Sequence, residues 1–341
     1  MPSDISEKFN DCFIVIDKPK GPTSHQVDYW VREITGISRV GHVGTLDPGV
    51  TGVLVMAMGK AVKLIDIVHE QPKEYVCVIR LYHDVDNTEL NKVLKEFTGT
   101  VYQIPPMRSA VSRTLRERTI YSIDVMERSE KLVFFRVKCQ SGTYIRTLCT
   151  DIGYALGVGA QMAELRRTVT GEFTEDGCIT LQDLKDYAQV LKDGYKSNAT
   201  IRIFPMDYPL RIYPKIIVKS SSLKNISRGS DLFPGGIKAV IGEPKKGDRV
   251  VAYSERNDLI GTGIMLVDHD NIADLKVLDF DRIMISPPKT ERKEYPTPPA
   301  REQFRANTLR NHHRPQYHPD QRKQPERERK QAWQNQRRRK N

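Results

Sequence analysis

The sequence lacks any long hydrophobic run: none of its 341 residues lies in a stretch of eighteen consecutive apolar positions. We therefore expect no membrane-spanning helix. The first residues also lack the basic segment followed by an apolar segment that marks a secretory signal. Both absences predict an intracellular protein that spans no membrane, cytoplasmic or, if the source is eukaryotic, nucleolar.

Cysteine is scarce as well. The five cysteines are odd in number, form no CxxC pair and do not cluster with histidine: they are Cys12, Cys77, Cys139, Cys149 and Cys178. Such a pattern predicts reduced, mostly buried thiols of an intracellular protein rather than a disulfide framework. Because the spacing of zinc ligands is absent, no metal site is predicted.

Positive charge is unevenly distributed along the chain. The formal net charge is +11, and residues 287–341 alone carry 16 Lys and Arg against 6 Asp and Glu. The rest of the chain is therefore almost neutral, and the basic character belongs to this last segment. Its apolar residues are sparse, so we expect a disordered basic tail that attracts polyanions.

Strand and helix patterns alternate irregularly, without a regular strand–helix–strand rhythm. Residues 13–17, 53–57, 75–81 and 132–139 are typical of strands, whereas 24–35, 89–97 and 143–156 have helical periodicity. Thr23 and Gln26 have the spacing of a capping box at the start of the first of these helices, and Gly36 can end it. This mixture favours an α+β fold with a mixed or antiparallel sheet. Short β-like runs over 212–286 indicate a second, small β-rich unit, a barrel or a sandwich. We therefore predict domains at 1–208 and 209–286 and a tail at 287–341.

The stretch GHVGTLDPGVTG, residues 41–52, is a loop with one carboxylate, Asp47. Pro48 favours an extended Asp47, and Pro48-Gly49 suits the two central positions of a type II turn. An isolated Asp-Pro-Gly is most often an ordinary turn. Here four glycines would also leave room for a ligand to approach closely, and a buried strand follows. Both interpretations stay open from the loop alone.

Four further positions are candidates for a site. Tyr75 begins a strand and is either a core residue or a platform for a flat ring. Arg146 lies in the first helical turn if Thr143 is the N-cap, where it meets a carboxylate or phosphate or snorkels at the surface. The stretch 165–167, Leu-Arg-Arg, is a solvated face or a phosphate contact. His42 fits a general base, a base contact or a loop filler.

Six stretches taken together resemble, in order, the motifs of the TruB-type pseudouridine synthases. They are DKPKGPTSHQV (17–27), GHVGTLDPGVTGVL (41–54), KEYVCVIRL (73–81), QIPPMRSAV (103–111), SGTYIRTL (141–148) and GAQMAELRRT (159–168). The PPMRSAV motif leads directly to the next strand, without the thumb insertion of bacterial members. The segment from Tyr213 is similar to a PUA domain. The chain thus looks closest to the archaeal H/ACA branch, the dyskerin-like catalytic subunit.

The resemblance implies a role for each candidate residue. It makes Asp47 the catalytic aspartate, pairs Arg146 with it, stacks Tyr75 on the target base, packs Leu165 in the pocket and places His42 near the flipped nucleotide. It implies no metal and no cofactor, because the isomerisation exchanges no electrons and transfers no outside group. Asp47 then acts as a nucleophile at C1′ or as a base at C2′.

Three functions remain open at this level. The first is an RNA-guided synthase that modifies rRNA, and possibly tRNA at U55, with H/ACA guide RNA and small accessory proteins as partners. The second is a stand-alone tRNA pseudouridine-55 synthase. The third is a non-catalytic RNA-binding scaffold that uses the PUA-like domain and the tail. Guide dependence separates the first two, and the presence of Asp47, Tyr75 and Arg146 argues against the third.

Overall fold

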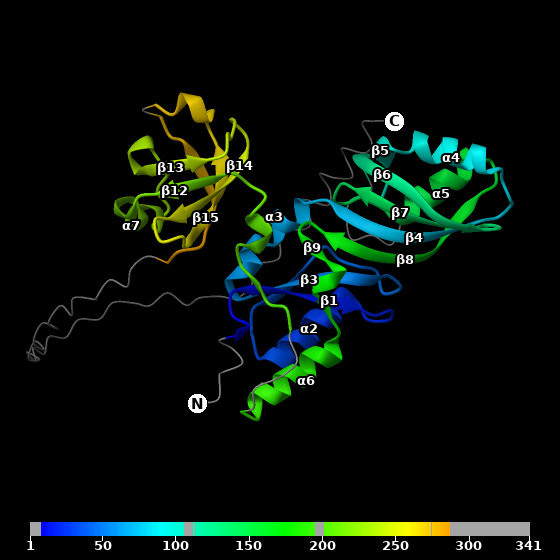
Figure 1. The fold of residues 1–341 in the computed structure, drawn as a ribbon, viewed down its shortest axis with the longest axis horizontal. Coiled ribbons are helices and arrows are strands. Elements are labelled where there is room, and N and C mark those ends of the chain that lie inside the picture. The colour runs from blue at the N-terminus through cyan, green and yellow to red at the C-terminus, as the bar shows by residue number, and fades with distance from the viewer. Residues whose placement is uncertain (1–7, 106–111, 113, 195–200, 274, 287–341) are drawn as a thin grey trace, which may run out of the picture. The chain divides into compact units, whose positions relative to one another are not determined.

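The structure is a computed structural model that describes residues 8–105, 112, 114–194, 201–273 and 275–286. Most of the PPMRSAV motif, residues 106–111, and the tail predicted over 287–341 lie outside the described residues. Figure 1 shows strands and helices in the mixed arrangement of an α+β protein, as the sequence predicts.

The larger sheet has eleven strands, and their bounds are β1 Cys12–Lys18, β2 Val40–Val43, β3 Thr51–Met58, β4 Lys73–Leu81, β5 Gly99–Gln103, β6 Arg116–Ser129, β7 Leu132–Cys139, β8 Ala160–Thr170, β9 Phe173–Thr174, β10 Cys178–Ile179 and β11 Phe204–Pro205. Eight of them form the order β10-β1-β3-β8-β4-β7-β6-β5, and β11, β2 and β9 pair with β1, β3 and β8. The β3–β8 and β1–β10 pairs are parallel, which makes the sheet mixed.

Five α-helices accompany this sheet among the described residues: α2 Ser24–Thr35, α3 Ile65–Glu70, α4 Asn87–Glu96, α5 Ile145–Ala155 and α6 Leu181–Lys192. Helices α2 and α6 pack together near β1, whereas α4 and α5 pack together farther along the sheet (Figure 1). Helix α5 also contacts β8, the strand at the centre of the order. This contact brings the start of α5 to the middle of the sheet.

Helix α2 begins as the sequence predicts. The Thr23 hydroxyl accepts a hydrogen bond from the Gln26 backbone nitrogen (3.1 Å), and the Gln26 side chain accepts one from the Thr23 nitrogen (2.8 Å). This reciprocal pair is a capping box. Gly36 ends the helix with φ +72°. Trp30 follows the apolar spacing of this helix but is 39% exposed, so it is not a core residue.

Helix α5 begins one residue later than the sequence suggests. Its N-cap is Tyr144, because the Thr143 hydroxyl donates instead to the Gln140 carbonyl (2.7 Å). The prediction of Thr143 as N-cap is therefore wrong. Arg146 still lies in the first turn of the helix, so the expected opposition to the helix dipole remains.

The second β-rich unit is a five-stranded sheet, with β12 Lys215–Val218, β13 Ile237–Ile241, β14 Arg249–Ser254, β15 Leu259–Met265 and β16 Leu278–Ile283 in the order β13-β12-β14-β15-β16. The pair β12–β14 is parallel, and the others are antiparallel. A short helix, α7 Leu223–Ile226, precedes β13. Side chains of β14, Val251 and Tyr253, pack in one apolar cluster with Phe13 and Val55 of the larger sheet.

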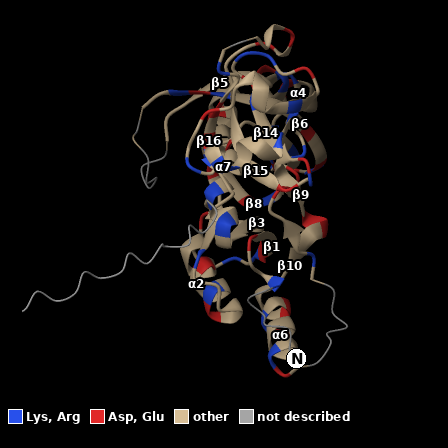
Figure 2. Ribbon diagram, turned by 90° about the vertical axis from the view of Figure 1, so that its left-hand side faces the viewer, with Lys and Arg blue, Asp and Glu red and all other residues tan. Residues whose placement is uncertain are grey.

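Lysine and arginine alternate with aspartate and glutamate over the described residues, as Figure 2 shows. This agrees with the near-neutral charge that the sequence assigns to the part of the chain before residue 287. The five cysteines, all within the described residues, are free thiols, as predicted. No helix of the described residues is both long enough and apolar enough to cross a membrane.

Candidate active site

The loop that carries Asp47 is fixed at both ends by the segment that follows β1. The Gly21 nitrogen donates to the Pro48 carbonyl (2.8 Å). Ser24 makes a reciprocal pair with Leu46: its hydroxyl donates to the Leu46 carbonyl (3.1 Å) and accepts from the Leu46 nitrogen (2.9 Å). Residues on either side of Asp47 are thus held by buried or backbone hydrogen bonds, which limits movement of the carboxylate.

Lys18, at the end of β1, is a second anchor of this loop. Its side chain is fully buried, and its ammonium group donates to the carbonyls of Pro48 (3.3 Å) and Val50 (2.9 Å) and to that of Pro19 (2.8 Å). Burial lowers the pKa of Lys18 below its ordinary value, and the negative charge of Asp47 opposes that shift. The buried Lys18 ammonium group therefore holds the backbone of the turn directly after Asp47.

The turn itself differs in type from the prediction. The Val50 nitrogen donates to the Asp47 carbonyl (3.0 Å), which closes a four-residue turn with Pro48 and Gly49 in the centre. A type II turn needs a positive φ at its third position, and Gly49 does not have one. The type II prediction is therefore wrong. The hydrogen bond from Val50 to Asp47 thus closes a turn in which Gly49 does not adopt the left-handed conformation.

Two of the four glycines in this stretch, Gly44 and Gly52, are required by their positive φ and by packing, whereas Gly41 is only closely packed against the end of a side chain. A Cβ at Gly52 (φ +99°) would lie 2.2 Å from the Arg167 carbonyl oxygen, and one at Gly44 (φ +70°) would lie 3.1 Å from the Arg167 guanidinium. A Cβ at Gly41 would lie 2.9 Å from an isoleucine side chain of α3. Only Gly49, of the four, faces open space. The idea that all four glycines clear space for a ligand is therefore restricted to Gly49.

Asp47 and Arg146, from the turn before β3 and from α5, are in direct contact. An Arg146 guanidinium nitrogen donates to the Asp47 carboxylate in an ion pair, and the two side chains are 46% and 57% exposed. At this exposure the pair adds little to stability. Its effect is on geometry, because a charge-assisted hydrogen bond fixes the direction of the carboxylate.

Tyr75 and Leu165 lie beside this loop because three neighbouring strands are in register. Arg167 of β8 pairs with Gly52 of β3 on one side and with Tyr75 of β4 on the other, and Leu165 pairs with Cys77. Burial raises the pKa of Tyr75, and the negative charge of Asp47 adds to that rise. Leu165 is 8% exposed and belongs to the core against which Tyr75 packs.

Arg167 is neither a solvated residue nor a free phosphate contact. It is fully buried, and its guanidinium donates to the backbone carbonyls of Val53 (2.8 Å) and Gly44 (2.8 Å). It thus joins β8 to the strand after the Asp47 loop and to the residues before it. Its neighbour Arg166 is partly exposed and donates to Asp17 (2.8 Å) and Glu175. The solvated-face interpretation is therefore wrong for Arg167.

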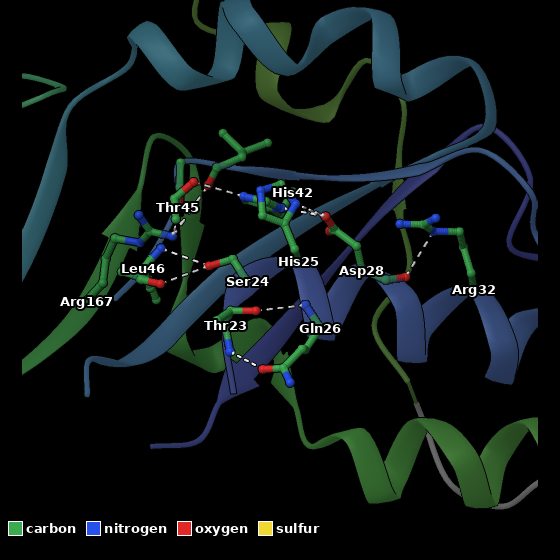
Figure 3. Close-up of polar contacts among 12 residues, drawn as sticks. Thr23, Ser24, His25, Gln26, Asp28, Arg32, His42, Thr45, Leu46 and Arg167 are labelled. Atoms are coloured by element: carbon green, nitrogen blue, oxygen red, sulfur yellow. Dashed lines mark hydrogen bonds and ion pairs between the residues drawn. The ribbon is translucent and has the colours of Figure 1, made fainter. Parts of the chain in front are cut away.

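His42 is held from both ring nitrogens, as Figure 3 shows. Its Nδ1 lies 2.8 Å from Asp28 Oδ2, and its Nε2 lies 3.0 Å from the Thr45 hydroxyl in the Asp47 loop. The Asp28 and His42 side chains are only 6% and 8% exposed. Because the carboxylate accepts from Nδ1–H, Nε2 is left to accept from Thr45. Asp28 of α2 thereby orients His42, and His42 contacts the loop.

The same corner contains the one group among the described residues whose donor atoms are close enough to hold a metal ion: His25, Asp28 and His42. His25 Nδ1 lies 3.5 Å from Asp28 Oδ2, and the His25 side chain is 83% exposed. The short distance between Asp28 and His42 is that of a hydrogen bond. The group is therefore a hydrogen-bonded pair, Asp28 and His42, with an exposed neighbour, His25.

Sequence reasoning missed Lys18 and Asp28 as residues of this site, and it found Arg167 without its structural role. All three are buried polar side chains that position others. Lys18 lies in the DKPKG stretch, so its motif was visible although its role was not. Asp28 is on the polar side of a helical pattern, and nothing in that pattern links it to His42. Only the fold brings them together.

Comparison with known families gives three consecutive matches. Residues 32–145 match the TruB family pseudouridylate synthase N-terminal domain. Residues 146–211 match the tRNA pseudouridylate synthase B C-terminal domain, and residues 214–283 match the PUA domain.

Similar proteins and structures agree with these matches. "Probable tRNA pseudouridine synthase B" of Picrophilus torridus is 58% identical, covering 83% of this chain and 81% of that protein. The protein of the same name from Thermoplasma acidophilum is 57% identical, covering 80% and 74%.

Two solved structures share the fold. The chain superposes with a TM-score of 0.77 on a chain of a Cbf5-Nop10-Gar1 complex, at 38% identity and with 83% and 88% covered. The TM-score is 0.76 with a chain of an H/ACA RNP bound to a substrate RNA containing 2′-deoxyuridine, at 36% identity and with 84% and 89% covered. The chain belongs to the TruB family of pseudouridine synthases. It is therefore an isomerase that converts uridine in RNA to pseudouridine.

Proposed function

We propose that Asp47 is the catalytic carboxylate of this isomerisation. The observation that carries the proposal is the ion pair with Arg146, formed on a turn that Lys18 and Ser24 anchor from below. In the reaction the N1–C1′ bond of uridine breaks, the uracil turns, and C5 bonds to C1′. C5 then loses its proton and N1 gains one. A carboxylate serves either as a nucleophile at C1′ or as a base at C2′.

The neighbouring residues receive roles that follow from their positions. A target uridine must leave the base stack to reach Asp47. Tyr75 offers an aromatic surface on which the uracil stacks, and stacking is worth about 1–3 kcal/mol per base. Leu165 closes the apolar side of the pocket, so that the detached uracil is retained. Arg146 orients the Asp47 carboxylate through their ion pair. We assign His42 a place near the flipped nucleotide, because it contacts Thr45 of the loop that carries Asp47.

We further propose that the chain acts as the RNA-guided catalytic subunit of an H/ACA ribonucleoprotein, with guide RNA and small accessory proteins. Two observations support this. The similar structures are chains of a Cbf5-Nop10-Gar1 complex and of an H/ACA RNP with substrate RNA. In addition, β6 begins at Arg116, soon after the PPMRSAV motif ends at Val111, so no long insertion separates them. Guide RNA would then supply the sequence recognition that such an insertion supplies elsewhere.

A stand-alone tRNA pseudouridine-55 synthase is the second candidate. The relatives from Picrophilus torridus and Thermoplasma acidophilum are both called probable tRNA pseudouridine synthase B, which supports a tRNA substrate. The two functions are compatible in one chain. The third interpretation, a non-catalytic scaffold, is disfavoured by membership in a synthase family and by the assembled Asp47–Arg146 pair.

The test is pseudouridine mapping under three conditions with the full chain. The first contains the chain and an unmodified tRNA, the second the chain and a target RNA, and the third adds guide RNA and accessory proteins to the second. We expect turnover of the guided target only in the third condition. Full turnover of bare tRNA, together with no gain from guide RNA, would show a stand-alone tRNA enzyme. The Asp47→Asn variant serves as the inactive control throughout.

The domain division at 208 and 286 and the cytoplasmic location complete the proposal. The matches to TruB models up to residue 211 and to a PUA domain over 214–283 support a catalytic unit followed by an RNA-binding unit. The similarity to an archaeal box H/ACA structure supports a cytoplasmic location, since archaea have no nucleolus.

The tail at 287–341 is proposed as an electrostatic RNA anchor, which its net charge supports. Deleting it should reduce the salt dependence of guide RNA binding, and an unchanged slope would exclude anchoring.

A further inference from the structure

A pocket of about 390 Å³ lies next to Arg146 and extends along α5 as far as Tyr154. Its wall on the helix consists of Arg146, Thr150 and Tyr154. These residues are spaced four apart, so they lie on one face of α5. The opposite wall consists of Tyr82, just after β4, and the first residues of β8, 160–162. The volume falls within the range of about 300–1,000 Å³ that is usual for ligand sites.

Two aromatic rings at this pocket are unusually exposed. Tyr154 is 74% exposed and Tyr82 is 52% exposed. The backbone nitrogen of Tyr82 donates to the Gly159 carbonyl (3.1 Å), and one side of the Tyr82 ring lies close to Gly159. A Cβ at Gly159 would lie only 2.8 Å from that ring. A ring that packs against the backbone at one side and is open to solvent at the other is suited to stacking with a flat ligand.

The charge around the pocket favours a nucleic acid over other flat ligands. Among the described residues that line it, none is acidic, and Arg146 contributes a cation. A second pocket of about 460 Å³ on the other side of α5 provides the contrast, because Glu96 and Asp151 line it. Carboxylates repel a phosphate backbone, whereas a cation attracts it. The first pocket is therefore the one that tolerates RNA.

Arg146 connects the pocket to the proposed catalytic carboxylate. It belongs to the pocket wall and at the same time pairs with Asp47. We propose that this pocket binds the nucleobase next to the target uridine, stacked on Tyr154 or Tyr82. This inference rests on the proposed function, because it assumes that a uridine is bound at Asp47. A base held there fixes the backbone on one side of the target and so helps to keep the uridine extruded.

Paired changes in protein and RNA test the proposal. The assay uses the assembled full-length enzyme and three RNA substrates: an intact one, one with an abasic site 5′ of the target, and one with an abasic site 3′ of it. With the unaltered chain, we expect one of the abasic substrates to show an increase in KM of about 5- to 150-fold, the range that corresponds to loss of one stacked base. In Tyr154→Leu or Tyr82→Leu, KM for the intact substrate should rise, and removing the same base should then have little further effect.

The control variant is Tyr29→Leu, since Tyr29 is 56% exposed on α2 and does not line the pocket. In this variant the abasic site should raise KM by the same factor as in the unaltered chain. The proposal would be overturned if both abasic sites changed KM by the same factor in Tyr154→Leu and Tyr82→Leu as in the unaltered chain. A 2-aminopurine at the sensitive position gives a second readout, because its fluorescence should rise in Tyr154→Leu or Tyr82→Leu.

Failure of this inference can be told apart from failure of the proposed function. If the enzyme converts the intact RNA normally but shows no coupling, the pocket proposal alone is wrong. If the assembled enzyme makes no pseudouridine from any RNA, the proposed function is wrong. In that case the 2-aminopurine signal, measured on bound RNA without turnover, still decides whether the pocket holds a base.

Discussion

Asp47 and Arg146 form an ion pair although 99 residues separate them in the sequence. Asp47 lies on the turn before β3, and Arg146 lies in the first turn of α5. The pair forms because α5 packs on β8, which lies between β3 and β4 in the sheet. The order of strands therefore creates the site, because it brings the Asp47 turn and the start of α5 together.

Removing the cation should impair catalysis far more than folding. In Arg146→Ala, we expect kcat to fall by at least about 100-fold, because a hydrogen bond to a charged group contributes about 1.5–3 kcal/mol and the carboxylate also loses its orientation. Arg146→Lys keeps the charge and should lose less. Arg282, which pairs with Asp66 at 3.0 Å, provides the control variant Arg282→Ala. Rates near those of the unaltered chain in Arg146→Ala would show that the pair is not needed.

Asp28 should act through His42. Asp28→Ala leaves the buried Nδ1–H of His42 without its acceptor, a loss of about 1–3 kcal/mol, so we expect kcat to fall about tenfold. Asp28→Asn retains an acceptor oxygen and should recover part of the rate. The NMR signal of the His42 Nδ1 proton should be visible in the unaltered chain and lost in Asp28→Ala. His25→Ala is the control, since His25 is 83% exposed. An unchanged rate and proton signal in Asp28→Ala would contradict the role.

Gly52, at the start of β3, and Gly49, in the turn after Asp47, should differ in how much an alanine substitution lowers stability. Gly52→Ala adds a Cβ 2.2 Å from a backbone oxygen at φ +99°, whereas Gly49→Ala adds one in open space. Positive φ and overpacking each cost about 1–3 kcal/mol, so Gly52→Ala should lose about 2–6 kcal/mol of unfolding free energy. Gly49→Ala should change it by less than about 1 kcal/mol. Urea denaturation measures both. Equal stability of the two variants would show that the loop glycines do not serve packing.

Lys73 should make stability depend on pH. It is 3% exposed and donates to the carbonyls of His69 (2.5 Å) and Gln71 (2.6 Å), and burial lowers its pKa from 10.5 to about 7. Between these values the unfolded chain binds more protons than the folded one, so the free energy of unfolding rises with pH. The largest slope that one proton gives is about 1.4 kcal/mol per pH unit.

Urea denaturation at pH 7.5 and pH 8.5 checks this, with Lys73→Met as the comparison. Methionine carries no proton, so its variant should lack this part of the slope. We expect the unaltered chain to gain about 1 kcal/mol relative to Lys73→Met over this interval. Parallel pH profiles of the two proteins would mean that Lys73 keeps its proton when the chain is folded.

Much of the fold was predictable from local pattern. The capping box of Thr23 and Gln26, the alternating strand at 132–139 and the buried strand after the Asp47 loop all appear as predicted. Local rules succeed there because a hydrogen bond or an apolar period within a few residues determines the structure. They fail at Thr143, whose hydroxyl bonds to a carbonyl three residues earlier instead of capping the helix.

The site was predictable only in part, and for a different reason. Asp47, Arg146, Tyr75, Leu165 and His42 were found through six ordered motifs, and their catalytic and binding roles remain predictions. The supporting residues Lys18, Asp28 and Arg167 act through contacts across 14 to 124 positions of the chain. No periodicity reveals a contact of that kind. The glycines show the same limit, because their requirement comes from Arg167 on another strand.

The most direct test of the account is Asp47→Asn, assayed for pseudouridine and for RNA binding in the same preparation. Asparagine keeps the size of the side chain but removes the negative charge that the chemistry needs. Asp84→Asn is the control, since Asp84 is 69% exposed and also pairs with an arginine, Arg128. We predict that Asp47→Asn forms no detectable pseudouridine while its RNA affinity stays within a few fold of the unaltered chain. A normal yield of pseudouridine from Asp47→Asn would contradict the central claim.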